Sequence, residues 1–186
     1  MARIFLSYSS GDNDILKPFL SIAKLACVEI KAVPFENVQA PAWSYIRELM
    51  SASDTFFLLL GKNIIDKGIY TQNWVSFEVG LACEMATTLR REVWVFEPWQ
   101  YKVKFPVPFL NHYLLFDINA KSHRNFIRTI MEAYKQDPFV RKVPQGINVK
   151  CPHCEVSFSL HTEAKDFDCP ACRRGILLLK TEKPPF

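Results

Sequence analysis

The stretch Thr55-Phe56-Phe57-Leu58-Leu59-Leu60 is apolar at every position after its threonine. A strand with one face in water alternates apolar and polar residues, so an unbroken apolar run is typical of a parallel strand covered on both faces. Parallel strands are joined by crossover segments, usually helices, that pack on the sheet. This stretch therefore predicts an α/β fold with helices on both faces. It is also far shorter than the ~20 apolar residues of a membrane span.

The sequence on either side repeats the same alternation of strands and helices. The pattern suits a flavodoxin-like, five-stranded parallel sheet of order 2-1-3-4-5, in which a ligand binds outside the carboxyl ends of the strands. Helices are indicated by apolar residues at three- and four-residue spacing. The predicted strands are Arg3–Tyr8, Val28–Val33, Thr55–Leu60, Glu92–Glu97 and Tyr113–Ile118, and the predicted helices carry Ile15–Ala26, Trp43–Met50, Asn73–Arg90 and residues 121–135.

Length and composition limit what the chain can be. Its 186 residues are 49% apolar, which suits one ordinary domain and one small module. We predict a main domain over residues 1–143 and a second unit over 144–186. The net charge is only +4 and no basic stripe is present, so charge gives nucleic-acid binding no support. The opening residues are not a basic segment followed by an apolar run, so we expect a cytoplasmic protein without membrane contact.

The six cysteines are of two kinds. Cys27 and Cys83 stand alone in apolar helical patterns and are predicted to be small buried hydrophobes. The other four form two C-x-x-C pairs with 14 residues between them, which in a cytosolic protein is typical of a metal site rather than of disulfides. Four thiolates complete a tetrahedral zinc site and leave no open position for catalysis, so the predicted role of Zn2+ is structural. The arrangement resembles a zinc ribbon, with the ligands Cys151, Cys154, Cys169 and Cys172.

Glu78 is the first candidate for catalysis. It lies on the apolar face of a predicted helix with Trp74 and Met85, whereas Glu84 falls on the solvated side. A carboxylate in an apolar stripe is costly unless it is paired or hydrogen-bonded, which makes it a site candidate. The alternative is a glutamate near a helix N-terminus that gains from the helix dipole and extends outward to solvent. The pattern alone does not choose between these interpretations.

Three boxes of sequence resemble the Toll/interleukin-1 receptor (TIR) domain family. Arg3–Ser10 followed by Asp12 is similar to the opening box of TIR domains, and Ser51–Leu60 is similar to their third strand and the helix end before it. The stretch Trp74-Val75-Ser76-Phe77-Glu78 resembles the tryptophan and glutamate, four apart, of NAD-cleaving TIR enzymes. The boxes match the family in order and spacing over about residues 1–135, which is most of the chain.

The resemblance implies an NAD+ nucleosidase with Glu78 as its catalytic carboxylate. Such an enzyme breaks the bond between nicotinamide and ribose, and one carboxylate beside the ribose stabilises the cationic transition state. The product is ADP-ribose or a cyclic isomer. Similar prokaryotic TIR proteins act in antiphage defence, either by making a signal that an effector or sensor protein detects or by depleting NAD. Two other classes stay open: a non-catalytic TIR scaffold that works by TIR–TIR contacts, and a nucleic-acid sensor based on the ribbon.

The resemblance also implies residues of an NAD+ pocket. Tyr8, Ser9 and Ser10 match the family's loop after the first strand, where hydroxyl and N–H groups would bind ribose or diphosphate. A helix-capping turn is the alternative for this loop. Trp43 matches an aromatic residue at the start of the second helix, and it either stacks on a base or fills the core. The same choice applies to Trp74, for which the core is the better interpretation.

The loop Pro34–Ala40 departs from the family. It lacks the receptor-type Arg-Asp and Pro-Gly signature, so receptor-style signalling contacts are not expected, and Phe35 and Glu36 are weak pocket candidates. It has few polar groups to close a dinucleotide pocket, and similar TIR enzymes complete the site across neighbouring subunits. We therefore expect activity to depend on self-association. The histidines have no partner at catalytic spacing, and His153 and His161 are predicted to lie at the surface.

Overall fold

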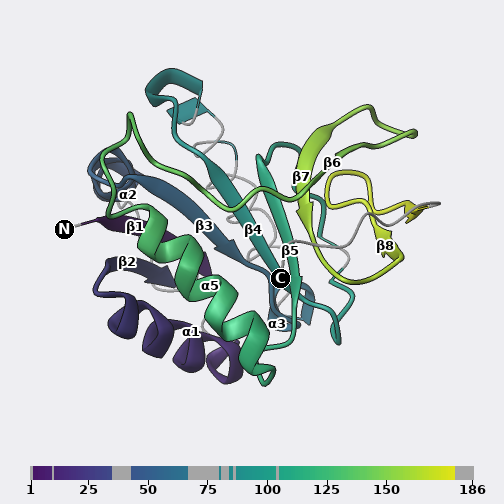
Figure 1. Cartoon of the computed structure of the whole chain (residues 1–186), viewed down its shortest axis with the longest axis horizontal. Coiled ribbons are helices and arrows are strands. Elements are labelled where there is room, and N and C mark those ends of the chain that lie inside the picture. The colour runs from purple at the N-terminus through teal and green to yellow at the C-terminus, as the bar shows by residue number, and fades with distance from the viewer. Residues whose placement is uncertain are drawn as a thin grey trace.

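The computed structural model of the chain describes residues 2–9, 11–34, 43–66, 80, 84–85, 87–103 and 105–178. Its strands are β1 (Arg3–Tyr8), β2 (Glu29–Pro34), β3 (Thr55–Leu59), β4 (Val93–Pro98), β5 (His112–Phe116), β6 (Ile147–Lys150), β7 (Ser157–His161), β8 (Asp166–Asp168) and β9 (Gly175–Leu177). Seven of them form one sheet of order β2-β1-β3-β4-β5-β7-β6, and β8 and β9 form a second, smaller sheet beside it (Figure 1).

The first five strands run parallel in the order 2-1-3-4-5. Each begins and ends close to its predicted bounds, which confirms the α/β class and the flavodoxin-like order. β1 and β3 are neighbours in the sheet although β2 comes between them in sequence. The strand order therefore reverses at β1 and β3. We call the carboxyl ends of these strands, with residues 9, 11, 12 and 60–63 that follow them, the switch-point edge.

The apolar run in β3 supplies both faces of the sheet. Phe56 and Leu58 join one cluster of buried side chains, while Phe57 and Leu59 join a second cluster on the opposite face. Successive side chains of a strand point to opposite faces, so a strand buried on both sides must be apolar throughout. The structure thus confirms the prediction that this strand is covered on both faces of the sheet.

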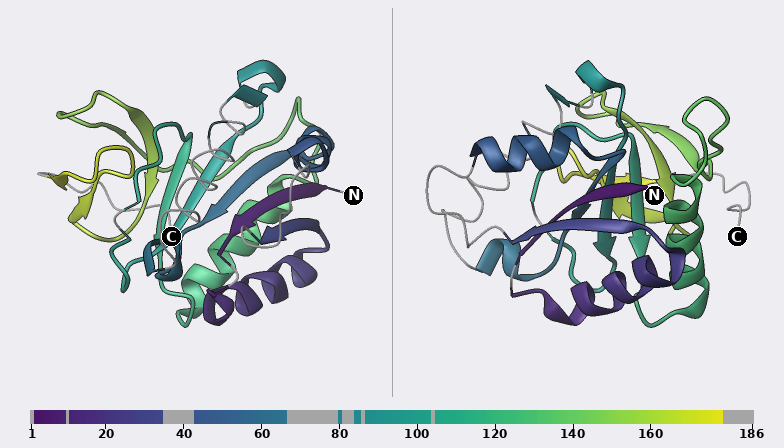
Figure 2. Two further views of the ribbon diagram at one scale, coloured as in Figure 1. Left: turned by 180° about the vertical axis from the view of Figure 1, so that it is seen from behind. Right: turned by 90° about the vertical axis from the view of Figure 1, so that its left-hand side faces the viewer.

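Helices cover both faces, as Figure 2 shows. α1 (Asn13–Ala26) and α5 (Lys121–Ala133) pack against each other on one face, and α2 (Trp43–Ser51) lies on the other, where Ile46 and Met50 join the core. α3 (Asn63–Asp66) is a short turn after β3. The helix predicted over Asn73–Arg90 lies largely outside the described residues. In the part of the chain that the structure describes, no helix combines the length and apolar character needed to cross a membrane.

Cys27 is not the buried residue that its apolar neighbours predict. It caps the C-terminus of α1 with a left-handed backbone (φ 54°) and is exposed. Its N–H donates to the carbonyl oxygen of Lys24 at 3.1 Å. The apolar face of α1 ends at Ala26, so Cys27 follows the helix instead of packing beneath it. Cys83 lies outside the described residues.

The large sheet continues across the predicted boundary between residues 143 and 144. β6 and β7 form an antiparallel hairpin, and β7 pairs in parallel with β5. Gly146 fits tightly at this junction, because its N–H donates to the hydroxyl of Ser159 at 2.9 Å and a Cβ there would clash with the carbonyl oxygen of Leu160. The division into two folding units stays a prediction, but the described strands of both units share one sheet.

Candidate functional site

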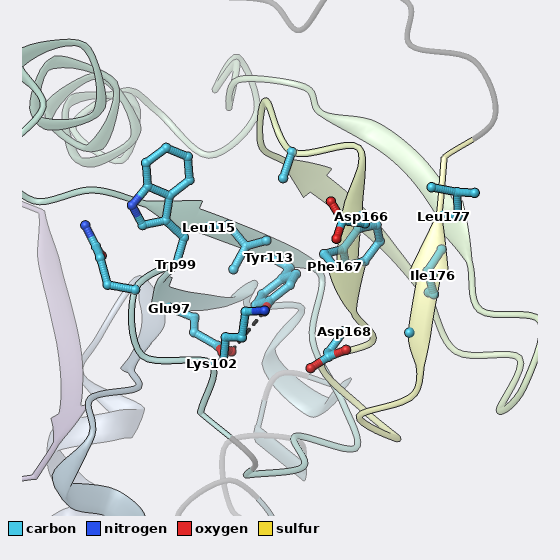
Figure 3. A pocket seen from close by; sticks show the side chains of 13 residues that line it. Glu97, Trp99, Lys102, Tyr113, Leu115, Asp166, Phe167, Asp168, Ile176 and Leu177 are labelled. Carbon is cyan, nitrogen blue, oxygen red and sulfur yellow. Dashed lines mark hydrogen bonds between the residues drawn. The ribbon is translucent and has the colours of Figure 1, made fainter.

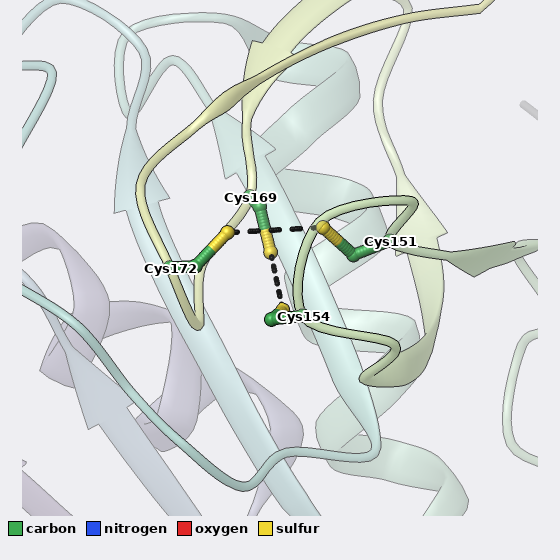
Figure 4. Close-up of side chains that lie close together, drawn as sticks. All are labelled: Cys151, Cys154, Cys169 and Cys172. Atoms are coloured by element: carbon green, nitrogen blue, oxygen red, sulfur yellow. Dashed lines mark hydrogen bonds between the residues drawn. The ribbon is translucent and has the colours of Figure 1, made fainter.

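Two hairpin turns bring the four predicted metal ligands together. Cys151 and Cys154 lie in the turn between β6 and β7, and Cys169 and Cys172 lie in the turn between β8 and β9. Their sulfur atoms all lie within 4.8 Å of one another (Figure 4). The sulfur atoms of Cys151 and Cys172 are 3.7 Å apart, and those of Cys154 and Cys169 are 3.8 Å apart. A disulfide would need ~2.05 Å, so these cysteines are free thiols.

The two turns share one backbone geometry. The residues that follow the second cysteine of each pair, Glu155 and Arg173, have φ values of 61° and 58°. Each donates its N–H to the carbonyl oxygen of the first cysteine of its pair, Cys151 at 2.9 Å and Cys169 at 2.8 Å. A left-handed backbone is uncommon outside glycine, so its occurrence at the same place in both turns marks a matched pair of knuckles.

The two short sulfur–sulfur separations match those of a tetrahedral zinc site. Four thiolates ~2.3 Å from a central Zn2+ would lie about 3.8 Å from one another, and the two separations above are 3.7 and 3.8 Å. Burial raises the pKa of Cys169 to about 12. For Cys151 burial acts in the same direction, but the N–H groups of His153 and Cys154 outweigh it and lower the pKa to about 7. A cation such as Zn2+ would stabilise all four thiolates side by side, so the cluster can bind a metal ion.

The second knuckle also sends a side chain into the large sheet. Arg173 donates from Nη1 to Oε2 of Glu97 and from Nε to the carbonyl oxygen of Phe105, both at 2.7 Å. Glu97 is only 3% exposed and accepts further hydrogen bonds from the hydroxyl of Tyr113 and the N–H of Val103, both at 2.9 Å. A buried carboxylate requires such partners. We call this contact between the knuckle and β4 the seam. No pattern in the sequence predicts it.

The switch-point edge contains two of the predicted NAD+-pocket residues. Tyr8 ends β1 and is half-buried, and Ser9 is buried directly after it. The carbonyl oxygen of Ser9 accepts the N–H of Asp12 at 2.9 Å, which leads the chain into α1. The loop is thus a turn into a helix, and it also lies at the sheet edge where a ligand is expected. The remaining predicted residues lie outside the described ones: Ser10, Phe35, Glu36, Trp74 and Glu78, together with the side chain of Trp43.

Asp12 is a site residue that sequence patterns indicate only as part of a capping turn and of the opening box. It is fully buried, and its side chain makes no capping bond to α1. Its Oδ1 accepts the backbone N–H of Asn63 at 3.1 Å and the side-chain amide at 2.6 Å, while Oδ2 is buried without a partner among the described residues. A Cβ at Gly61 would clash with this carboxyl group. Burial raises the pKa of Asp12.

Asp12 therefore connects the loops that follow β1 and β3. A glycine directly after one apolar strand and an aspartate shortly after another were the available signals in the sequence. Neither signal pairs the two residues, because their proximity depends on β1 and β3 being neighbours in the sheet.

A polar cluster near the amino ends of β4 and β5 corrects the prediction for one histidine. His161 is 1% exposed and not at the surface, whereas His153 is exposed as predicted. The Nε2 of His161 lies 3.3 Å from Nδ1 of His112, whose Nε2 lies 3.4 Å from Oε1 of Glu92. Both rings stack on the indole of Trp94, and burial lowers the pKa of His161 to about 3. The cluster packs β4, β5 and β7 together through a neutral His161.

Comparison with known proteins finds similarity of structure only. No family model matches the chain, and no curated protein matches it. It is similar to a diflavin flavoprotein A3 from Nostoc sp., with 13% identity and a TM-score of 0.46 over 70% of this chain and 89% of that one. It is also similar to the glutaminase domain of a Trypanosoma brucei CTPS with bound acivicin, with 16% identity and a TM-score of 0.33 over 52% of this chain and 36% of that one. At such distances neither neighbour bears on activity.

Proposed function

We propose that the chain is a TIR-like NAD+ nucleosidase with Glu78 as its catalytic carboxylate. One observation supports this most: the two boxes of resemblance at Arg3–Asp12 and Ser51–Leu60 contain β1 and β3, which are adjacent parallel strands. The loops after these strands meet at the switch-point edge, where flavodoxin-like folds bind their ligands. The third box, with Trp74 and Glu78, follows α3 along the chain.

The chemistry requires one carboxylate and little else. As the bond between the nicotinamide nitrogen and ribose breaks, positive charge develops on the sugar carbon, and the carboxylate of Glu78 would stabilise it. Nicotinamide leaves as a neutral molecule, so no general acid is needed. Capture by water gives ADP-ribose, and attack by the adenine or a ribose hydroxyl of the same substrate gives a cyclic isomer. Tyr8 and Ser9 would bind the ribose or the diphosphate.

We infer a role in prokaryotic antiphage defence, through a nucleotide signal or through loss of NAD+. The loop Pro34–Ala40 has few polar groups to close a dinucleotide pocket, so we propose that assembly of several chains completes the site. Specific activity should then rise more than linearly with protein concentration. Constant specific activity in a protein that stays monomeric by light scattering would contradict this part of the proposal.

Chromatography of NAD+ incubated with purified protein tests the activity. Wild type should release nicotinamide, and Glu78→Gln should release it at least ~100-fold more slowly, because a charge that stabilises the transition state is lost. Glu84→Gln is the matched control: Glu84 is exposed, lies six positions further along, and should not alter the rate. Equal rates for wild type and Glu78→Gln would overturn the assignment. No release over concentrations that include the assembled protein would favour the non-catalytic scaffold.

We propose a structural role for the metal. Four thiolates fill a tetrahedral Zn2+ site, so no position stays open for a substrate or water. β8 and β9 have three residues each and cannot form a core alone, whereas structural zinc contributes ~10–16 kcal/mol of apparent binding free energy in small modules. A ribbon that instead senses nucleic acid would bind labelled oligonucleotides with an affinity that falls steeply as salt is raised.

A further inference from the structure

A cavity of about 620 Å³ lies between the carboxyl ends of β4 and β5 and the β8–β9 hairpin (Figure 3). Its volume is within the range of ~300–1,000 Å³ typical of small-molecule sites. Trp99 and Lys102 line it from the segment after β4, and Asp166 and Asp168 line it from β8. The predicted pocket residues Tyr8 and Ser9, at the end of another strand, do not line this cavity.

The cavity carries a net negative charge. Glu97 lines it too, but its carboxylate is balanced by the guanidinium of Arg173 at 2.7 Å. Lys102, Asp166 and Asp168 make no ion pair with any other residue that the structure describes. Two carboxylates therefore face one ammonium group, and a cationic ligand would balance the excess.

Apolar surface completes the lining. The side chain of Trp99 is 46% exposed and that of Leu177 is 66% exposed, and Figure 3 places them on opposite sides of the cavity. Leu115 and Ile176 add aliphatic surface between them. The face of an indole attracts cations because its π electrons concentrate negative charge there. The lining thus combines an aromatic face, aliphatic walls and two carboxylates that form no ion pair with another described residue.

We propose that this cavity binds a small aromatic cation, with its ring against Trp99 and its positive group near Asp166 and Asp168. The ring would cover apolar surface that is now in water, and the cation would donate charge-assisted hydrogen bonds to the two carboxylates. A neutral ligand of the same shape keeps only the ring contacts, and an anion is repelled. Asp168 precedes the metal ligand Cys169, so the metal centre positions the carboxylate wall of the site.

Three probes of one shape test the proposal: 2-naphthamidine is a cation, 2-naphthamide is neutral and 2-naphthoate is an anion. Calorimetric titration into the zinc-loaded full chain should show the cation binding about tenfold more tightly than the amide, and no saturable binding of the anion. The double variant Asp166→Asn, Asp168→Asn should reduce the affinity for the cation to that for the amide. Trp99→Ala should weaken binding of both.

Two single variants sharpen the test. Lys102→Met removes the ammonium group of Lys102 from the cavity wall and should strengthen cation binding by about threefold. Glu132→Gln removes an exposed carboxylate on α5, on the opposite face of the sheet, and should leave every affinity unchanged. The proposal is overturned if no probe binds saturably, if cation and amide bind equally, or if the double variant keeps the preference for the cation. None of these results depends on NAD+ cleavage, so they leave the proposed activity to its own test.

Discussion

Glu97 and Asp12 are both carboxylates buried near the carboxyl ends of strands in one sheet, and their surroundings differ. Glu97 accepts hydrogen bonds on both oxygens and forms an ion pair with Arg173. Asp12 accepts two hydrogen bonds from Asn63 on one oxygen, and its other buried oxygen has no partner within the described ranges.

This difference distinguishes a structural contact from a group that keeps capacity for a ligand. A buried carboxylate with all its partners holds two parts of a protein together, and losing one partner is costly. A buried carboxyl group with a raised pKa and an unused oxygen can still accept a proton or a ligand donor. We therefore expect the seam at Glu97 to control stability, and the switch-point edge at Asp12 to respond to pH and ligands.

Loss of the metal should give the largest difference in stability between the seam and the switch-point edge. Chelation or Cys169→Ser should unfold β8 and β9, because the ~10–16 kcal/mol of zinc binding is then weakened or lost. Arg173 would leave Glu97, whereas β1 and α1 have their own core contacts. Hydrogen exchange should lose protection over residues 166–177 and near Glu97, but not over 13–26.

Cys27→Ser is the matched control for this experiment, because Cys27 is exposed and lies outside the cluster. It should keep one zinc per chain and the exchange pattern of wild type. Metal analysis that finds no zinc in freshly purified protein would contradict the assignment. So would equal loss of protection in α1 and in the β8–β9 hairpin.

Arg173→Met should destabilise the protein strongly. It leaves Glu97 buried without its cation, which costs about 3–5 kcal/mol of the free energy of unfolding. Arg128→Met breaks an exposed pair with Glu132 and should cost less than about 1 kcal/mol. Urea denaturation at saturating zinc measures both. A loss below 1 kcal/mol for Arg173→Met would show that the seam contributes little.

The strands and the metal ligands could be predicted because their signals are local. The apolar run at Thr55–Leu59 and the two C-x-x-C pairs are each complete within a few residues. The seam could not be predicted in this way, since Arg173 and Glu97 are 76 residues apart and both belong to types common at protein surfaces. Arg173 and Glu97 come into contact only because the β6–β7 hairpin pairs with β5. The alternation of residues within a strand does not determine which strand it pairs with.

The histidine cluster shows the same limit. His112 and His161 are 49 residues apart and meet because β7 pairs with β5. Spacing along the chain suggests neither the contact nor the burial of His161. Sequence patterns therefore miss the polar contacts between residues far apart in the chain. The hydrogen bonds of Glu97 with Arg173 and with Tyr113 are two examples.

Asp12→Asn should change how stability depends on pH. Burial raises the pKa of Asp12 in the folded state above its unfolded value, so the folded state binds the proton more tightly. Wild type therefore gains stability relative to the non-titrating variant as pH falls through the raised pKa, and loses that gain as pH rises above it. Urea titrations from pH 7 to pH 4 measure the difference in unfolding free energy between the two. A difference that stays constant with pH would contradict the burial of this group.

Removal of a single hydroxyl, either in the seam or near the switch-point edge, should change the free energy of unfolding least. Tyr113→Phe deletes a donor to Glu97 inside the seam, and Tyr101→Phe deletes a donor to Asp14 at 2.7 Å near the switch-point edge. Tyr113→Phe should cost about 1–2 kcal/mol, because a buried charged acceptor loses a partner that water cannot replace. Tyr101→Phe should cost about 0.5 kcal/mol or less, since Asp14 is exposed and water takes the place of the hydroxyl.

The pH dependence of the Tyr101 contact gives an independent check. Its hydrogen bond to Asp14 raises the pKa of Tyr101 to about 12, so the contribution of this bond is complete below pH 10 and disappears as pH rises toward 12. The small gap in stability between wild type and Tyr101→Phe should close over that range. Burial, together with the charge of Glu97, raises the pKa of Tyr113 as well, so above pH 10 the unfolded state loses this proton while the folded state keeps it. The larger gap for Tyr113→Phe should therefore also fall as pH rises from 10. A gap for Tyr113→Phe that stays constant above pH 10 would show that this hydroxyl is not buried beside the charge of Glu97, and the distinction between the seam and the switch-point edge would fail.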